Sequence, residues 1–383
     1  MNMKYFFAFA VVALLFSSCE TEVELNAPYK STTVVYGLLD PVQDTQWIKI
    51  NRTFLGDGNN FDYALVRDSS EYDFSEFKRL VVEEYLDGNK TNEWALQEKE
   101  ITNKSINGIF YGPLQTVYFF RPAALNQNAE YRLVIDFFDR EDVEATTPLV
   151  QPNEITFVNL TSSQGLTISM ATKTGENSFE FNTLERSFRP DDSAPFYEVV
   201  VRFNYTEKKY TDATHTTLVS ETPKHVDYFC GSYTSEDSES GKIRYTVDGE
   251  AFFNLLGNTL TNDPSIVYQI GTYDPTFTPA PETQCFETII YAGGSELYTY
   301  IQVNTPTSGV VQERPTYSNV SNGIGLFSSR STAAIRDIPL INSNPQQVPN
   351  TGNALAFRFS QYTNMLNFCD PGNMASGILT TCE

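Results

Sequence analysis

TTVVYGLL (residues 32–39) and WIKINRTF (residues 47–54) are the two stretches that decide the fold class, and a turn around Asp40 and Pro41 separates them. The second stretch places alternate side chains on two faces: Ile48, Ile50, Arg52 and Phe54 against Trp47, Lys49, Asn51 and Thr53. A period of two is typical of a strand with one buried face. The two stretches therefore predict paired β-strands at the start of a mainly β protein.

Two further hairpins follow in the same part of the chain. The apolar residues 80–86 run into Asp87 and Gly88, and Asp-Gly favours the hairpin turns that need positive φ. Residues 131–138 and 143–147 form the second candidate hairpin. Four to six strands in about 120 residues predict an immunoglobulin-like β-sandwich over residues 31–150. The two prolines within residues 148–152 predict a linker at its end.

Residues 151–383 are predicted to form a second β-rich domain with one or two short helices. Its strands are expected at residues 155–158, 166–170, 197–205, 243–247, 288–291 and 355–359. Asp248 is a candidate N-cap for a helix over residues 250–256, and residues 296–301 form either a second helix or a strand. Gly, Pro, Ser and Asn are frequent in residues 305–331 and 342–352, which are expected to be long surface loops.

The composition describes an acidic globular protein. The 383 residues carry 26 Lys and Arg against 48 Asp and Glu, a net charge of −22, and 40% of the residues are hydrophobic. This hydrophobic content supports a packed core rather than an acidic disordered chain. The sequence contains no basic stripe that could neutralise phosphates, which argues against nucleic acid as a partner.

The first 18 residues have the pattern of a signal peptide. Lys4 is the only charge before Cys19, and the apolar run of about 12 residues is shorter than the roughly 20 that a spanning helix needs. Ser17 and Ser18 before Cys19 resemble a bacterial lipobox, which implies that Cys19 is lipidated and that residues 19–30 form a lipidated tether. The acidic tract at residues 20–24 resembles the surface-export signal of Bacteroidetes lipoproteins, or is an ordinary solvated tether.

Several short stretches together resemble a family of Bacteroidetes outer-membrane lipoproteins, the domain-of-unknown-function 4249 type. They are Cys19 with its acidic tract, the hairpin over residues 131–147, ELYTY at residues 296–300 and, most strongly, YSNVSNGIGLFSS at residues 317–329. The resemblance implies a surface accessory protein often found with TonB-dependent transporters. The family supplies no known catalytic residues.

A search for reactive motifs finds little. The two histidines, His215 and His225, lie in a polar stretch without metal-ligand spacing, and no Gly-x-Ser-x-Gly elbow is present. Asp191 and Asp192 form the most conspicuous acidic pair, although a loop after Pro190 is expected to be simply solvated. Asp57, Asn59 and Asp62 could offer oxygen ligands to calcium, but a plain Asx-rich turn is the preferred interpretation. We therefore expect no catalytic residue, metal or cofactor.

Four aromatic residues are the candidate partner-binding residues, because they lie in an acidic segment between strands where no core position is obvious. They are Tyr63, Tyr72, Phe74 and Phe77. The sequence thus predicts an outer-membrane lipoprotein facing the cell exterior and acting as a non-catalytic accessory or binding subunit, for which the family resemblance implies a TonB-dependent transporter as partner. The alternative is a surface hydrolase acting on polysaccharide, since a glycosidase needs only two carboxylates.

Four cysteines remain after Cys19, an even number in an oxidising compartment. They are Cys230, Cys285, Cys369 and Cys382, and three pairings are open. The 12 residues between Cys369 and Cys382 contain Pro371, Gly372 and Gly377, which favours closing that loop. Cys230 would then pair with Cys285 by elimination.

Overall fold

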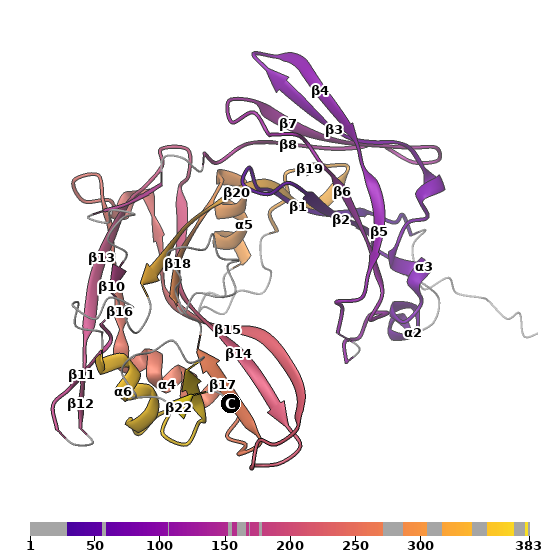
Figure 1. Ribbon diagram of the computed structural model, residues 1–383. Coiled ribbons are helices and arrows are strands. Elements are labelled where there is room, and N and C mark those ends of the chain that lie inside the picture. Colours follow the sequence, from indigo (N-terminus) through magenta and orange to yellow (C-terminus); the bar gives the residue numbers. More distant parts are fainter. Residues whose placement is uncertain are drawn as a thin grey trace, which may run out of the picture.

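The computed structural model describes residues 29–55, 59–105, 107–151, 155–158, 166–167, 169–175, 178–270, 286–304, 316–338, 351–370 and 380–381. The predicted signal peptide, Cys19, Cys285 and Cys382 lie outside these residues. The described chain is mainly β, as the sequence predicts, and it forms two β-rich units joined by one long sheet (Figure 1).

The first unit is a sandwich of two antiparallel layers. One layer has the order β1 (Thr33–Leu39), β2 (Gln46–Arg52), β6 (Gln115–Phe120) and β5 (Gln97–Ile101). The other has the order β8 (Val143–Pro148), β7 (Glu130–Phe137), β3 (Phe77–Leu86) and β4 (Asn89–Ala95). Successive hairpins thus alternate between layers in the A-B-E-D and G-F-C arrangement of immunoglobulin domains, with one strand added beside C. The predicted immunoglobulin-like sandwich is confirmed.

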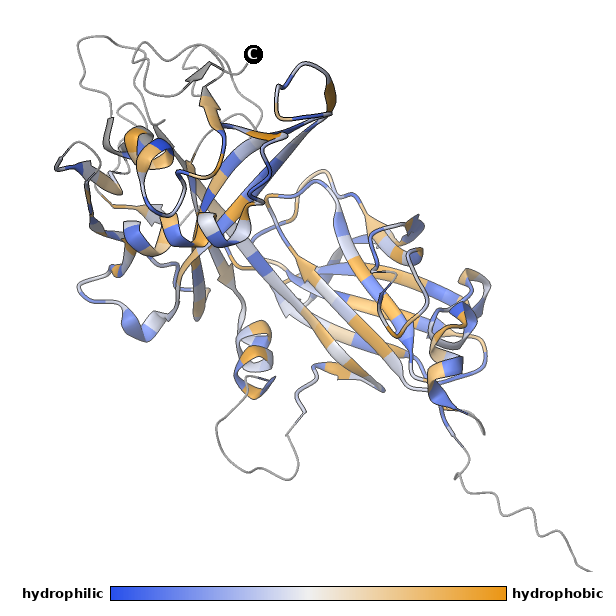
Figure 2. Ribbon diagram, turned by 90° about the horizontal axis from the view of Figure 1, so that it is seen from below, coloured by the Kyte–Doolittle hydropathy of each residue, from blue (hydrophilic) through white to orange (hydrophobic). Residues whose placement is uncertain are grey.

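Local features explain this arrangement. Asp87 and Gly88 have φ of +50° and +77°, so the predicted hairpin turn joins β3 and β4. Tyr131 lies at the start of β7, where its hydroxyl accepts from Asn126 N at 2.7 Å and donates to Glu84 Oε2 at 2.6 Å. A tyrosine that bonds back to the loop before strand F is typical of these sandwiches. The strands alternate between hydrophobic and hydrophilic residues, as Figure 2 shows.

The second unit contains a larger hydrophobic core than the first unit does. Its main layer contains β14 (Phe196–Tyr210), β15 (Leu218–Thr234), β17 (Ile266–Ile270), β18 (Phe286–Gly293), β21 (Phe368–Asp370) and β22 (Thr380–Thr381). Smaller pieces complete it: β9 (Thr156–Phe157), β10 (Leu166–Thr167), β11 (Ala171–Lys173), β12 (Phe179–Phe181), β13 (Thr183–Arg189), β16 (Ile243–Asp248) and the helices α4 (Gly249–Thr259) and α6 (Thr351–Phe359). Phe203 stacks on Phe357 at 5.1 Å in the centre of this core.

β20 (Gly323–Ile338) belongs to both units. Residues 323–329 pair in parallel with β1, and residues 330–337 pair antiparallel with β18, while β19 (Val320–Ser321) extends the other layer beside β8. The prediction of a surface loop over residues 305–331 is therefore wrong for residues 320–331. Small residues mark close packing here: Gly325 has φ of +118°, and a Cβ at this position would lie 1.9 Å from Val35 O.

Hydrogen bonds from side chains hold this shared strand in place. The carboxamide of Asn319 donates to Phe327 O at 2.6 Å and accepts from Phe327 N at 3.0 Å, so it acts as a short piece of strand. The buried Ser329 hydroxyl accepts from Val150 N at 3.0 Å. The stretch at residues 317–329, which carries the family resemblance most strongly, is thus explained by packing between the two units.

The predicted helices and one predicted strand give a mixed outcome. α4 starts after Asp248, whose carboxylate accepts from Ala251 N at 3.0 Å, and α5 (Ser295–Asn304) confirms the helical alternative for residues 296–301. The strand predicted at residues 355–359 is wrong, because these residues end α6. Alternation over five residues cannot separate strand from helix, and Phe357 packs against Phe253 and Phe368 from this helix.

The change from one core to the other occurs within the predicted linker. Leu149 packs in the first core and Val150 in the second, and both side chains are buried. The boundary is not a simple cut in sequence, however, because Val320 and Phe327 return to the first core.

Candidate functional site

A groove lies between α5 and the outer face of the long sheet, and we call it the α5 groove. It has a volume of about 740 Å³, within the usual range for ligand pockets of about 300–1,000 Å³. Side chains of β1, β2, β20 and α5 line it together with the turn at residues 40–46: Tyr36, Leu38, Asp40, Gln43, Asp44, Thr45, Gln46, Trp47, Leu297, Tyr300, Ile301, Leu326 and Arg330. A smaller pocket of about 280 Å³ shares Leu38, Leu297, Ile301 and Arg330 and reaches residues of β14 and β18.

The N-terminal turn of α5 is attached to β20. Gly294 N donates to Ser329 O at 3.0 Å, and Leu297 N donates to Ser328 Oγ at 3.2 Å. Tyr298 stacks on Phe196 of β14 at 5.8 Å between ring centroids. None of the α5 residues is fully buried, so the helix forms an open wall of the groove rather than part of a core.

Two tyrosines meet across the groove. The hydroxyls of Tyr36 and Tyr300 are 3.3 Å apart, and their rings meet edge to face with centroids 6.2 Å apart. The hydrogen bond to Tyr300, together with partial burial, raises the pKa of Tyr36 to about 12. Both faces therefore offer hydroxyl groups and aromatic rings to a ligand.

A buried carboxylate borders the groove. Asp40 is 2% exposed, and its Oδ1 accepts from Val42 N at 3.1 Å. Its Oδ2 forms a long ion pair with Arg330 Nε at 3.4 Å. Burial raises the pKa of Asp40, although Val42 and Arg330 oppose the shift. The side chain of Gln46 fixes the turn by bonding to both Asp40 N and Asp40 O.

The groove was not predicted from the sequence, although a signal for it exists. Tyr36 and Trp47 are 47% and 41% exposed on the outward faces of β1 and β2, where a half-buried strand normally carries polar residues. Large aromatic residues at such positions indicate a binding surface. The arrangement suits a neutral ligand with apolar ring faces and hydroxyl or amide groups.

The four predicted partner-binding aromatics separate into two pairs. Tyr63 and Phe74 are exposed at 38% and 41%. Tyr72 and Phe77 are buried at 4% and 8% and belong to the core of the first unit, so the prediction of one exposed aromatic surface is wrong for them. The chain between β2 and β3 folds back across the end of the sandwich and gives these two rings core positions.

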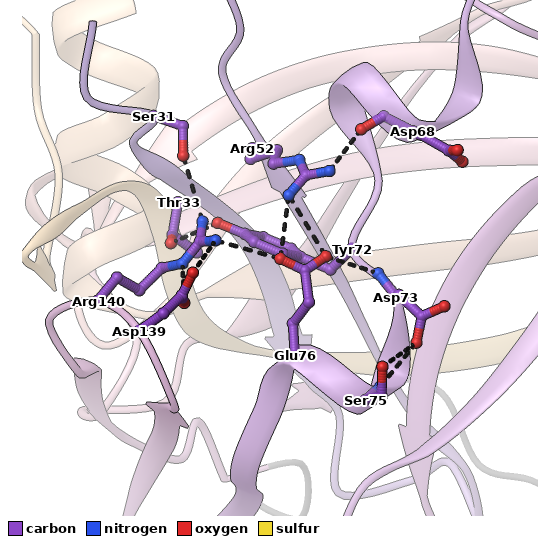
Figure 3. Close-up of polar contacts among 10 residues, drawn as sticks. All are labelled: Ser31, Thr33, Arg52, Asp68, Tyr72, Asp73, Ser75, Glu76, Asp139 and Arg140. Carbon is purple, nitrogen blue, oxygen red and sulfur yellow. Dashed lines mark hydrogen bonds and ion pairs between the residues drawn. The ribbon is translucent and has the colours of Figure 1, made fainter. Parts of the chain in front are cut away.

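Figure 3 shows how Tyr72 is held. Its hydroxyl lies 2.8 Å from Thr33 Oγ1, and the guanidinium groups of Arg52 and Arg140 each lie 5.2 Å from its ring centroid. Glu76 accepts from both arginines at 3.1 Å. Arginines that share one carboxylate around one ring fix the relative positions of β1, β2 and the β7–β8 loop.

An acidic cavity of about 440 Å³ lies beside this cluster, and Glu71, Glu98 and Glu100 are among its lining residues. Glu71 is 5% exposed, and it accepts from Thr116 N, Thr116 Oγ1 and Arg67 Nε and pairs with Lys49 at 3.1 Å. Burial alone would raise the pKa of Glu71, but these bonds together hold it below its ordinary value. A general acid needs the opposite shift, so the bonds of Glu71 favour a structural role.

Three of the four remaining sequence candidates have structural partners. His215 Nε2 lies 2.7 Å from Pro264 O, and His225 is 3.9 Å from Asp227. Asp191 belongs to a loop held by a buried tyrosine, since Asp191 N donates to the Tyr197 hydroxyl at 2.8 Å. Asp192 is exposed.

The proposed calcium loop is described only in part. Asn59 caps α2 (Asn60–Ala64) by accepting from Phe61 N at 3.1 Å, and Asp62 lies within that helix. Asp57 lies outside the described residues. Across the part of the chain that the structure describes, no cluster of His, Cys, Asp or Glu has the composition of a metal site.

The predicted disulfide pairing needs one correction. Cys230 carries a free thiol, which contradicts its pairing with Cys285. Burial raises the pKa of this thiol to about 12. Cys369 is disulfide-bonded, but its partner is not among the described residues, so the bond to Cys382 stays a prediction.

Two comparisons with known proteins find no match. No protein-family model matches the chain, and no curated protein sequence matches it. The likeness to domain-of-unknown-function 4249 lipoproteins therefore rests on the short motifs alone. Within the described ranges, no helix is both long enough and apolar enough to span a membrane.

Proposed function

We propose that this protein is a lipid-anchored, non-catalytic binding protein of the outer-membrane surface, and that the α5 groove holds its ligand or a segment of its partner. The groove is the observation that carries this proposal, because exposed aromatic rings line an open cavity of ligand size. The predicted lipidation of Cys19 supports the location. The resemblance to accessory lipoproteins favours a TonB-dependent transporter as the partner.

Affinity capture from detergent-solubilised outer membranes tests this function. The wild-type protein is expected to enrich an outer-membrane transporter, and the double variant Trp47→Ser with Tyr300→Ser is expected to lose it. Leu218→Ser is the matched control, because Leu218 is 47% exposed on β15 and does not line the groove. Equal capture by all three proteins, or no capture of any outer-membrane protein, would contradict the proposal.

A surface hydrolase is the second candidate, and one observation favours it. Asp40 has a raised pKa at the edge of the groove, and Asp44 lines the same cavity. A carboxyl with a raised pKa beside a second carboxylate is the pair that glycoside hydrolysis uses. Polysaccharide turnover by the purified protein that is lost in Asp40→Asn would establish this candidate and overturn the non-catalytic one.

A further inference from the structure

We infer that the end of the first unit from which the N-terminal tether leaves rests on the lipid surface of the membrane through exposed apolar side chains. We call this end the apolar tip. The inference rests on the proposed function in one respect, since it takes the lipidated tether from it.

The apolar tip consists of three loops and the first described residue. The chain between β2 and β3, the chain between β5 and β6 and the β7–β8 loop all leave the same end of the sandwich. Backbone bonds join them: Tyr111 N donates to Ala64 O at 2.8 Å, and Phe138 N donates to Glu76 O at 3.4 Å. Figure 1 places α2 and α3 (Arg67–Ser70) of this end on the side of the first unit away from the second.

Exposed apolar residues concentrate at this tip. Of the nineteen large hydrophobic residues with high exposure in the described chain, ten belong to it: Tyr29, Leu55, Phe61, Tyr63, Leu65, Val66, Phe74, Ile109, Phe110 and Phe138. Phe61, Leu65 and Phe138 are 63%, 59% and 71% exposed. Among the described residues at the opposite end of the sandwich, Val42 alone belongs to this set. A patch of this kind on one end of a folded unit marks an interaction site.

The tether identifies what covers the tip. Tyr29 bonds to Thr53, and Lys30 pairs with Glu141 at 2.9 Å, so the chain enters the first unit at the tip. Tyr29 lies ten positions after Cys19 in the sequence, and an extended chain of that length spans at most about 33–36 Å. If Cys19 is held at the bilayer, this end of the sandwich stays within that distance of the lipid.

The charges at the tip favour apolar contact over electrostatic attraction. Its described acidic residues outnumber its basic ones: they are Asp62, Asp68, Glu71, Asp73, Glu76, Asp139, Glu141 and Asp142, against Lys30, Arg67, Lys104 and Arg140. Anionic headgroups would therefore not attract it, and binding would depend on burial of the apolar side chains at the headgroup boundary. Weak dependence on salt is the expected signature.

The tip has a rigid base, which limits the entropy lost on binding. Arg52, Glu76 and Arg140 fix the loops around Tyr72, and the capping box of Asp73 and Glu76 closes the short helix at Phe74–Glu76 (Figure 3). Loops that are ordered before contact present their apolar side chains without further folding.

Tryptophan quenching by lipid tests the inference. Phe110→Trp places a reporter at the tip, and Val42→Trp places one at the opposite end; both positions are exposed, so both proteins should fold. Each protein carries a hexahistidine tag in place of the acyl group at residue 19. Vesicles of phosphatidylethanolamine, phosphatidylglycerol and brominated phosphatidylcholine bind the tagged protein through a nickel-chelating lipid.

The expected result is loss of emission for Phe110→Trp only, with Val42→Trp quenched no more than the wild type. The variant Phe61→Ser with Leu65→Ser is expected to lower partitioning of the untethered chain onto these vesicles at least about tenfold. The matched control, Leu218→Ser with Val219→Ser on β15, should leave partitioning unchanged. Absence of quenching at Phe110→Trp, or equal quenching at both positions, would overturn the inference.

The tagged tether separates this outcome from that of the proposed function. Metabolic labelling of Cys19 with a fatty-acid analogue tests lipidation, and capture through the α5 groove tests binding. Quenching at the tip without labelling would keep the lipid contact and refute the anchor. Labelling and capture without quenching would support the anchor and the binding function and refute the lipid contact of the tip.

Discussion

Substitution of Gly325 by alanine is expected to unfold the first unit at much lower denaturant than the wild type requires. Gly325 has φ of +118°, a conformation that L side chains rarely adopt, and this strain costs about 1–3 kcal/mol. The new Cβ would also lie 1.9 Å from Val35 O, a backbone atom in the paired strand β1. Overpacking of this kind costs a further 1–3 kcal/mol or so, giving about 2–6 kcal/mol in total.

Two other glycines separate these contributions. Gly88 has φ of +77° with no atom within 4 Å of an added Cβ, so Gly88→Ala measures conformation alone, at about 1–2 kcal/mol. At Gly37 φ is not positive and the nearest atom is Phe327 Cδ2 at 3.0 Å, a side chain that can shift, so Gly37→Ala measures packing alone. We expect Gly325→Ala to lower the free energy of unfolding more than either Gly88→Ala or Gly37→Ala does.

Urea unfolding with two probes measures the effect. Both tryptophans of the chain, Trp47 and Trp94, lie in the first unit, so their fluorescence reports that unit, and circular dichroism reports both. Gly325→Ala should move the fluorescence midpoint more than the dichroism midpoint, because β20 loses its pairing with β1 first. A variant that is no less stable than Gly88→Ala would refute the assigned packing of β20 against β1.

Four further outcomes follow from the buried groups and the predicted anchor. Tyr72→Ser should cost about 3–5 kcal/mol in urea unfolding and Tyr63→Ser less than about 0.5, because only the first ring lies in the core. Since bonding lowers the pKa of Glu71 in the folded state, its contribution is complete above the unfolded pKa and is lost as pH falls through the folded one; Glu71→Gln should flatten that part of the stability profile. Cys230, with its pKa raised to about 12, should resist iodoacetamide at pH 8 until the protein is unfolded. Cys19→Ser should abolish fatty-acid labelling, and equal labelling of wild type and variant would refute the lipidation site.

The period-two alternation of apolar and polar residues predicted most of the first unit correctly, because its strands carry one buried face. Ile48 and Ile50 are 1% exposed, as their alternation with Trp47 and Lys49 predicts. The turn at Asp87 and Gly88 was equally clear, since positive φ is a property of the residues themselves. Local signals sufficed wherever the structure depends on neighbours in sequence.

Long-range packing explains what could not be predicted. Glycines and serines at residues 323–331 indicate a loop by composition, yet they form a central strand because Gly325 lets two backbones approach and Ser329 bonds to Val150. Tyr72 and Phe77 lie in an acidic segment, but the rings of Phe137 and Tyr118 give them core partners. The α5 groove escaped prediction for the same reason, since its walls come from residues about 260 positions apart in sequence, Tyr36 and Tyr300.

β1 connects the proposed ligand groove to the proposed membrane contact. Thr33, at the tip end of β1, bonds to Tyr72, while Tyr36 and Leu38 of the same strand line the groove. A strand rises about 3.3 Å per residue, so Tyr36 lies roughly 10 Å and Leu38 about 17 Å along β1 from Thr33 at the tip end. Contact between the tip and lipid would therefore hold a bound ligand close to the membrane surface. Loss of the tip should therefore weaken capture of a membrane partner by intact vesicles, whereas capture from detergent-solubilised membranes should depend on the groove alone.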